Sequence, residues 1–256
     1  MLRAVVSYLA VFAVGYALLC GWMFATQRSQ MYFPTPPSEA AHAQASWIDS
    51  AGERIKVWVV SRPGPAALLY FGGNAEDVAG TVDSLFAAIP DRSLYLVNYR
   101  GYGGSTGRPT EAGLRADALA IYDDVRRRHA DVAVMGRSLG SGVAVHVASA
   151  RPVERLVLVT AFDSLANVAA AHFAWLPVRT LLKDRYESAA RARDVSARVL
   201  MVLAERDEIV PRARSDALAA AFRPGQAEVV VAPDVDHNTL DLSPEYLPSV
   251  RRFLTP

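Results

Sequence analysis

The chain has 256 residues, of which 52% are hydrophobic and 21% charged, and its formal net charge is +1 at pH 7. These values are typical of one globular domain with a short appendage, and they exclude nucleic acid or a polyanion as an expected partner. The single cysteine, Cys20, excludes an internal disulfide framework and a cysteine-rich metal site. Arginine greatly outnumbers lysine, a bias that fits a bacterial genome rich in G and C.

The first predicted element is an uncharged, apolar segment at residues 4–27. At about 1.5 Å of rise per residue, a helix of this length crosses a hydrocarbon core of roughly 30 Å, so we expect a transmembrane anchor. A cleaved signal peptide is the alternative, but the apolar run is longer than usual and Met23-Phe24-Ala25 is a poor cleavage site. Arg3 and Arg28 flank the segment and slightly favour a cytoplasmic amino terminus. The rest of the chain would then lie on the periplasmic face of a bacterial inner membrane.

Residues 28–44 are predicted to form a linker, because their prolines prevent a regular element. Residues 45–256 are predicted to form one α/β domain. Apolar runs of strand type alternate there with helical patterns, which indicates a mainly parallel, eight-stranded sheet flanked by helices. A helical segment at about 162–190, rich in large apolar residues, is expected to form a small cap.

A Gly-x-Ser-x-Gly pentapeptide spans Gly136–Gly140, between an apolar strand pattern and a small-residue helix pattern. A strand that turns directly into a helix forces the central residue into a strained conformation and presents its side chain to substrate. The flanking glycines remove side chains that would collide with neighbouring elements. The pattern predicts Ser138 as a nucleophile.

A serine hydroxyl needs an imidazole to take its proton and a carboxylate to orient that imidazole. In this strand–helix arrangement the acid and then the histidine follow the serine along the chain, each after a strand. Asp207 follows the predicted strand at 199–203, and His237 follows the one at 228–231. Asp163 also follows a predicted strand and is an alternative acid.

The other histidines are weaker candidates for the base. His146 lies too far along the helix after the pentapeptide to reach Ser138, and His172 lies in the predicted cap, where it could line a pocket. His42 is in the linker and His129 is at a helix end.

The transition state of acyl transfer carries an oxyanion, so two backbone N–H groups are expected to face it. Leu139 would supply one at the start of its helix, and Asn74 would supply the other after the predicted strand at 66–71. Gly73 lets the backbone approach there, although a plain tight turn is the alternative. Neither a P-loop lysine nor a dinucleotide fingerprint is present, which argues against a phosphate cradle. Arg137 is expected to contact substrate or to form a structural salt bridge.

Five motifs carry a resemblance to a known family: Phe71-Gly72-Gly73-Asn74-Ala75, Asn98-Tyr99-Arg100-Gly101-Tyr102-Gly103-Gly104-Ser105, Gly136-Arg137-Ser138-Leu139-Gly140, Asp207 with Val210-Pro211, and His237-Asn238. From about residue 30 to the end, the chain resembles an α/β-hydrolase. More narrowly, it resembles the membrane-anchored branch that groups serine-aminopeptidase-like and palmitoyl-protein-thioesterase-like members.

The resemblance implies that Ser138, Asp207 and His237 form a triad, with Asn74 and Leu139 at the oxyanion hole. Two positions depart from the family pattern: Gly72 stands where histidine is frequent, and Ala204 where glycine is frequent. Both departures bear on loop geometry more than on activity.

We therefore expect a membrane-anchored serine hydrolase that cleaves an ester or thioester through an acyl-enzyme, without a metal or organic cofactor. Its expected partners are a small-molecule or acylated-protein substrate and the lipid bilayer, and the anchor suggests a lipid-like acyl group. Two alternatives stay open. One is a serine peptidase of the same fold, and the other is a catalytically silent, membrane-bound scaffold or binding protein.

Overall fold

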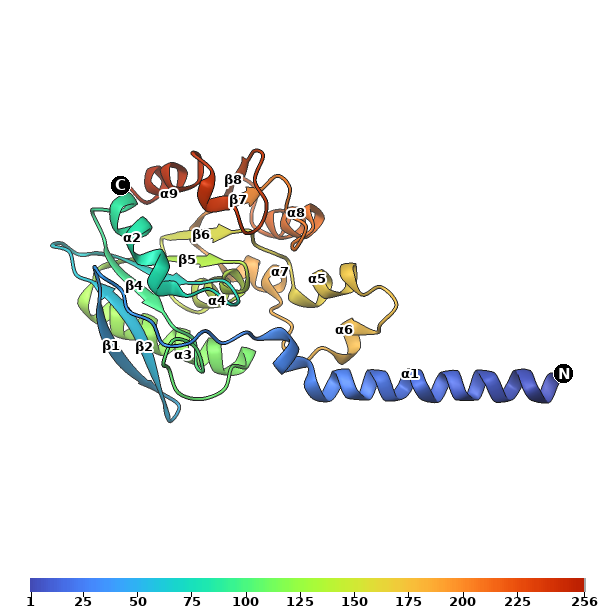
Figure 1. Ribbon diagram of the computed structural model, residues 1–256. Helices are drawn as coiled ribbons and strands as arrows, with labels where there is room; N and C mark the ends of the chain where they lie inside the picture. Colours follow the sequence, from blue (N-terminus) through green and yellow to red (C-terminus); the bar gives the residue numbers. More distant parts are fainter. Residues whose placement is uncertain (256) are drawn as a thin grey trace.

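The computed structural model describes residues 1–255, so the last residue of the expected α/β domain, 256, lies outside the described residues. A long N-terminal helix, α1 (Leu2–Met31), projects from an α/β domain (Figure 1). No residue of α1 is buried, and by length and composition the helix is able to cross a membrane, a property that signal sequences share. It begins before the expected span at 4–27 and continues through Met31, into the expected linker. No proline precedes Pro34, so nothing in the sequence stops the helix earlier.

The domain contains one eight-stranded sheet in the order β1-β2-β4-β3-β5-β6-β7-β8. The β1–β2 and β2–β4 pairs are antiparallel and all the others are parallel, as the alternating pattern predicted. The strands are β1 (Gln44–Ser50), β2 (Glu53–Val60), β3 (Ala66–Phe71), β4 (Ser93–Val97), β5 (Asp131–Arg137), β6 (Arg155–Val159), β7 (Arg198–Ala204) and β8 (Ala227–Ala232).

Helices cover both faces of this sheet (Figure 1). Alternate residues of β3 show the division, because Leu69 packs with one buried cluster and Leu68 with the other. One face carries α3 (Glu111–Arg128), α4 (Leu139–Ala150) and α8 (Arg212–Ala221); the other carries α2 (Val78–Ala88) and α9 (Tyr246–Leu254).

The cap lies between β6 and β7, close to the expected range of 162–190. It consists of α5 (Leu165–His172), α6 (Val178–Leu181) and α7 (Ser188–Arg191), followed by a 3₁₀ turn at Ala192–Asp194. The C-terminal half of α1 runs beside α6 in Figure 1, and hydrogen bonds join the two segments. The parallel strands end on the side of the domain that faces α5 and α1 (Figure 1). The residues that follow these strands therefore gather near the junction between the cap and α1.

Candidate active site

Ser138 lies at the turn between β5 and α4 and adopts φ 49° and ψ −116°. A positive φ is costly for a residue with a side chain and persists only where the surroundings enforce it. Glycine is needed on both sides. A Cβ on Gly140 would lie 2.1 Å from the Phe71 carbonyl oxygen, and one on Gly136 would lie 2.2 Å from the Gly140 carbonyl oxygen. The pentapeptide therefore forms the sharp strand-to-helix turn that the sequence predicted.

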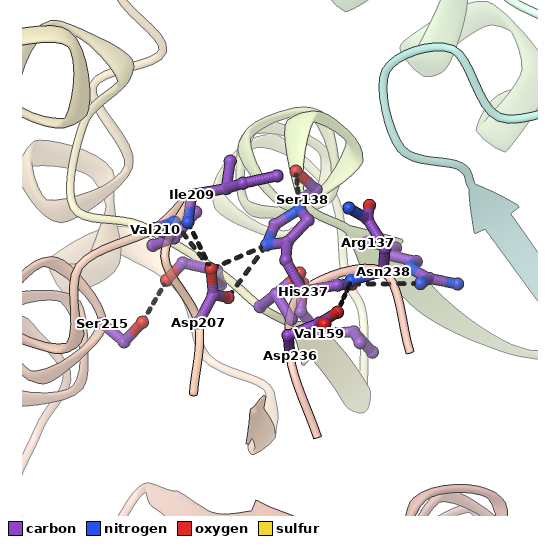
Figure 2. Close-up of polar contacts among 12 residues, drawn as sticks. Arg137, Ser138, Val159, Asp207, Ile209, Val210, Ser215, Asp236, His237 and Asn238 are labelled. Carbon is purple, nitrogen blue, oxygen red and sulfur yellow. Dashed lines mark hydrogen bonds and ion pairs between the residues drawn. The ribbon is translucent and has the colours of Figure 1, made fainter. Parts of the chain in front are cut away.

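Ser138, His237 and Asp207 lie in one hydrogen-bonded row (Figure 2). His237 Nε2 is 2.9 Å from Ser138 Oγ, and His237 Nδ1 is 2.8 Å from Asp207 Oδ2. A carboxylate only accepts hydrogen bonds, so the proton of the neutral imidazole belongs on Nδ1 and Nε2 is left to accept from the serine hydroxyl. The imidazole is buried. This arrangement suits removal of the Ser138 proton.

The Asp207 carboxylate is fixed from its other side by its own loop. Its Oδ1 accepts hydrogen bonds from the backbone N–H groups of Ile209 (3.0 Å) and Val210 (2.7 Å). Asp163, the alternative acid, instead accepts from Asn167 Nδ2 and forms a 3.2 Å ion pair with Arg214. The geometry therefore brings Asp207, and not Asp163, to the histidine.

Arg137 connects the turn at Ser138 to the loop that carries His237. Its guanidinium donates to the His237 carbonyl oxygen (3.3 Å) and pairs with Asp241 at 2.7 Å. Hydrogen bonds with the backbone N–H of Asn238, then with the side chain of Thr239 and its backbone N–H, hold the pKa of the Asp236 carboxyl below its usual range. Of the two roles expected for Arg137, the structure shows the salt bridge, and its partners brace the histidine loop.

The loop after β3 approaches Ser138 closely. A Cβ on Gly73 would lie 3.7 Å from Ser138 Cβ, which is ordinary van der Waals contact. Within residues 1–255, the backbone N–H groups of Asn74 and Leu139 have no hydrogen-bond acceptor. Unpaired backbone donors of this kind are able to receive an oxyanion.

Glu76 holds this loop, a role that its sequence position does not reveal. Its carboxylate accepts from the backbone N–H of Gly73 (2.6 Å) and from the hydroxyls of Tyr70 and Thr81 (both 2.8 Å). Burial and then the nearby carboxylate raise the pKa of Tyr70, so its hydroxyl stays protonated and donates. The Gly73 N–H is thereby occupied, which leaves the N–H of Asn74 as the free donor. A Glu three residues after a glycine is too common a pattern to have predicted this contact.

The two departures from the family pattern have local packing explanations. A Cβ at Gly72 would lie 2.7 Å from Val78 Cγ1, so the glycine lets α2 approach the loop closely. Ala204 is buried at the end of β7 in the sheet core. Neither position removes a group from the row of three side chains.

The other four histidines lie apart from this row. His172 contacts the Ile209 carbonyl oxygen at 2.9 Å, which places the end of α5 beside the Asp207 loop. His146 is buried within α4, His129 contacts the Tyr95 hydroxyl, and His42 pairs with Asp83. Among residues 1–255, no three His, Cys, Asp or Glu side chains are grouped so as to hold a metal ion.

We first compare the structure with solved structures of other proteins. The esterase Pf2001 of Pyrococcus furiosus superposes with a TM-score of 0.66 at 15% identity, over 88% of this chain and 97% of the esterase. With the eight-stranded sheet and the strand-to-helix turn, this likeness shows that the domain has the α/β-hydrolase fold. No family model matches the sequence.

Comparison of the sequences then identifies relatives of this chain. It is 38% identical to the uncharacterized protein Rv2307c of Mycobacterium tuberculosis over 98% of this chain and 94% of that protein, and the two belong to one family. It is also 28% identical to the lysophosphatidylserine lipase ABHD12 of Gallus gallus, over 65% of this chain and 50% of the lipase.

Proposed function

We propose that the chain is a serine hydrolase that cleaves an ester or thioester of a lipid-like acyl group through an acyl-enzyme. The observation that carries the proposal is the row from Ser138 Oγ through His237 to Asp207, with spacings of 2.9 and 2.8 Å. Hydrogen-bond spacing between nucleophile, base and orienting acid is the general signature of an activated serine. The lipase named among the relatives supports an acyl-lipid substrate.

In this mechanism Ser138 Oγ attacks the acyl carbonyl carbon while its proton passes to His237 Nε2. Asp207 stabilises the resulting imidazolium, and the N–H groups of Leu139 and Asn74 donate to the oxyanion. The intermediate then expels the alcohol or thiol, which takes the proton from His237 and leaves the acyl group on the serine. A water molecule then loses a proton to His237 Nε2 and attacks the carbonyl carbon of the acyl-enzyme. The bond from that carbon to Ser138 Oγ breaks, Oγ takes the proton back from His237, and the acid is released.

We further propose that α1 anchors the protein in a membrane as a single span, with its amino terminus in the cytoplasm and the α/β domain on the periplasmic side. The exposed apolar surface of α1 supports this, because water would otherwise surround residues such as Leu9 and Phe12. Membership of the serine-aminopeptidase-like and palmitoyl-protein-thioesterase-like branch stays a prediction.

A fluorophosphonate probe tests the nucleophile. We expect the full-length, detergent-solubilised protein to be labelled, and expect labelling to be lost in Ser138→Ala and His237→Ala. Ser149→Ala is a matched control, because Ser149 lies on α4 and bonds the His146 carbonyl oxygen, apart from the triad row. A folded wild type that takes no label would instead support the scaffold alternative.

A substrate panel separates the esterase and peptidase alternatives. We expect hydrolysis of acyl p-nitrophenyl esters and acyl thioesters, and no comparable rate on aminoacyl p-nitroanilides. Faster cleavage of the anilides, lost in Ser138→Ala, would favour the peptidase.

A further inference from the structure

An apolar cavity of about 260 Å³ lies between the anchor helix and the cap. The last two turns of α1 form one wall, including Phe24 and Met31, and the cap forms the other, including Ala169, Phe173 and Leu181. None of the lining side chains carries a charge. A cavity with this lining excludes polar groups and favours hydrocarbon.

Hydrogen bonds and an ion pair near the C-terminal end of α1 hold the two walls together. Gln27 donates to the Leu181 carbonyl oxygen (3.1 Å) and accepts from the Lys183 backbone N–H (2.7 Å). Arg28 pairs with the buried carboxylate of Asp184 at 2.9 Å. Because buried carboxylates are costly to leave unpaired, this pair favours the docked position of α1. The cavity is therefore part of the folded structure.

The cavity lies at the same edge of the sheet as the hydrogen-bonded row of Ser138, His237 and Asp207. Its lining residue Met31 accepts a hydrogen bond through its backbone oxygen from the side chain of Asn74, which follows Gly73 in the loop beside Ser138. At the other end of the cap, His172 of α5 contacts the Asp207 loop. An ester whose carbonyl lies at Ser138 thus has the cavity beside it.

The cap extends from the cavity along α1 toward its apolar middle. The Tyr16 hydroxyl donates to the Trp175 carbonyl oxygen at 2.8 Å, and at about 1.5 Å per residue Tyr16 lies roughly 16 Å along the helix from Gln27. Trp175 and Phe173 are 59% and 46% exposed. If α1 spans the membrane, these side chains contact lipid, and Tyr16 satisfies a backbone carbonyl that has no water there.

We infer that this cavity binds the acyl chain of a membrane lipid, which enters from the bilayer between α1 and the cap while its ester reaches Ser138. The inference rests on the proposed ester hydrolysis and assigns the anchor helix a second role, as one wall of the substrate site. The occupant is a lipid chain because the lining carries no charge and because one wall of the cavity is α1, the helix proposed to span the membrane.

A chain-length profile of the full-length protein in phosphatidylcholine vesicles tests the inference. We compare acetyl and palmitoyl p-nitrophenyl esters in the wild type, Ala169→Trp and Ala171→Trp. Ala169 lines the cavity, whereas Ala171 is exposed on the same helix and does not line it. We expect Ala169→Trp to lower the palmitoyl-to-acetyl ratio of kcat/KM by about tenfold or more, because the lost burial of several methylenes disfavours only the long chain. We expect Ala171→Trp to retain the wild-type ratio. An unchanged ratio in Ala169→Trp would overturn the inference.

A binding measurement separates this inference from the hydrolysis itself. Ser138→Ala in the same vesicles is irradiated with a palmitoyl ester that carries a diazirine near the end of its chain. We expect crosslinks to cap residues such as Phe173 and Leu181, and expect Ala169→Trp in this background to remove them. Crosslinks confined to the lipid-facing surface of α1 would overturn the cavity assignment. This result holds whether or not the wild type hydrolyses the ester, so failure of the proposed function is recognised independently.

Discussion

The side-chain amide of Asn74 donates to the last carbonyl oxygen of α1, that of Met31, at 2.5 Å. Its Oδ1 accepts from the Phe33 backbone N–H (3.1 Å) and from the Tyr102 hydroxyl (2.8 Å). One residue of the loop beside Ser138 thereby holds the C-terminal end of α1. These bonds connect the end of α1 to the loop that is proposed to receive the oxyanion.

Asn74→Ala keeps the backbone N–H and removes all three side-chain bonds. We expect kcat for a short ester to fall about tenfold, because the N–H is no longer held in position. Tyr102→Phe, which removes the bond to Oδ1 but keeps the amide bond to Met31, is expected to have a smaller effect. Steady-state kinetics of both variants check this, and wild-type kcat in Asn74→Ala would show that the side chain does not position the loop.

Asp207→Asn tests the acid. The substitution keeps the size of the side chain but removes the charge that stabilises the imidazolium, so we expect kcat to fall by about 10³–10⁴-fold. Asp163→Asn is the matched control, because Asp163 follows the neighbouring strand and contacts Arg214 and not His237. It is expected to retain kcat within a few-fold. The opposite ranking in ester hydrolysis, with both proteins folded by circular dichroism, would assign the acid to Asp163.

Gly140→Ala and Gly80→Ala form a pair with opposite expected signs. The added Cβ at Gly140 meets the Phe71 carbonyl oxygen at 2.1 Å, and the backbone must move, at a cost of about 3 kcal/mol in the free energy of unfolding. Gly80 lies on α2 with nothing within 4 Å of the new Cβ. There the higher helix propensity of alanine is expected to add about 0.5–1 kcal/mol. Urea unfolding of the detergent-solubilised proteins measures both, and equal stabilities would contradict the close packing at the turn.

His146 makes stability depend on pH. Burial and then the charge of Arg115 lower the pKa of this imidazole to about 4, below the ordinary value near 6.5 of the unfolded chain. Arg191 and Arg151 add to the same shift. Between these two pKa values the unfolded state binds more protons, so stability falls as pH falls through this window, by about 2 kcal/mol between about pH 7.5 and about pH 5.

His146→Met removes this titration and leaves the rest of the chain unchanged. We expect its unfolding free energy to depend less on pH than that of the wild type, by the same amount of about 2 kcal/mol over that window. Urea unfolding at the two pH values measures the difference. Parallel pH dependences in the two proteins would show that His146 does not titrate on unfolding.

The sequence by itself determined the alternation of strands and helices and the residues expected to form the triad row. Side-chain periodicity and turn chemistry are local properties, so the apolar run before Gly136 and the turn at Ser138 were readable without a structure. The chain order Ser138, Asp207, His237, with each residue after a strand, predicted their meeting because parallel strands end at the same edge of a sheet.

Only the tertiary structure decided which contacts hold these residues in place. Glu76 was unremarkable in sequence, yet folding brings its carboxylate to the Gly73 N–H and to Tyr70. The anchor and the cap meet through Gln27 and Leu181, 154 residues apart, and no local pattern specifies that pairing. Contacts of this kind form only when the packed layers bring residues together that are distant in the sequence. The linker at 28–44, in contrast, was predicted from a local property, the positions of its prolines. For the same reason no pattern in the sequence indicates that α1 forms one wall of a cavity.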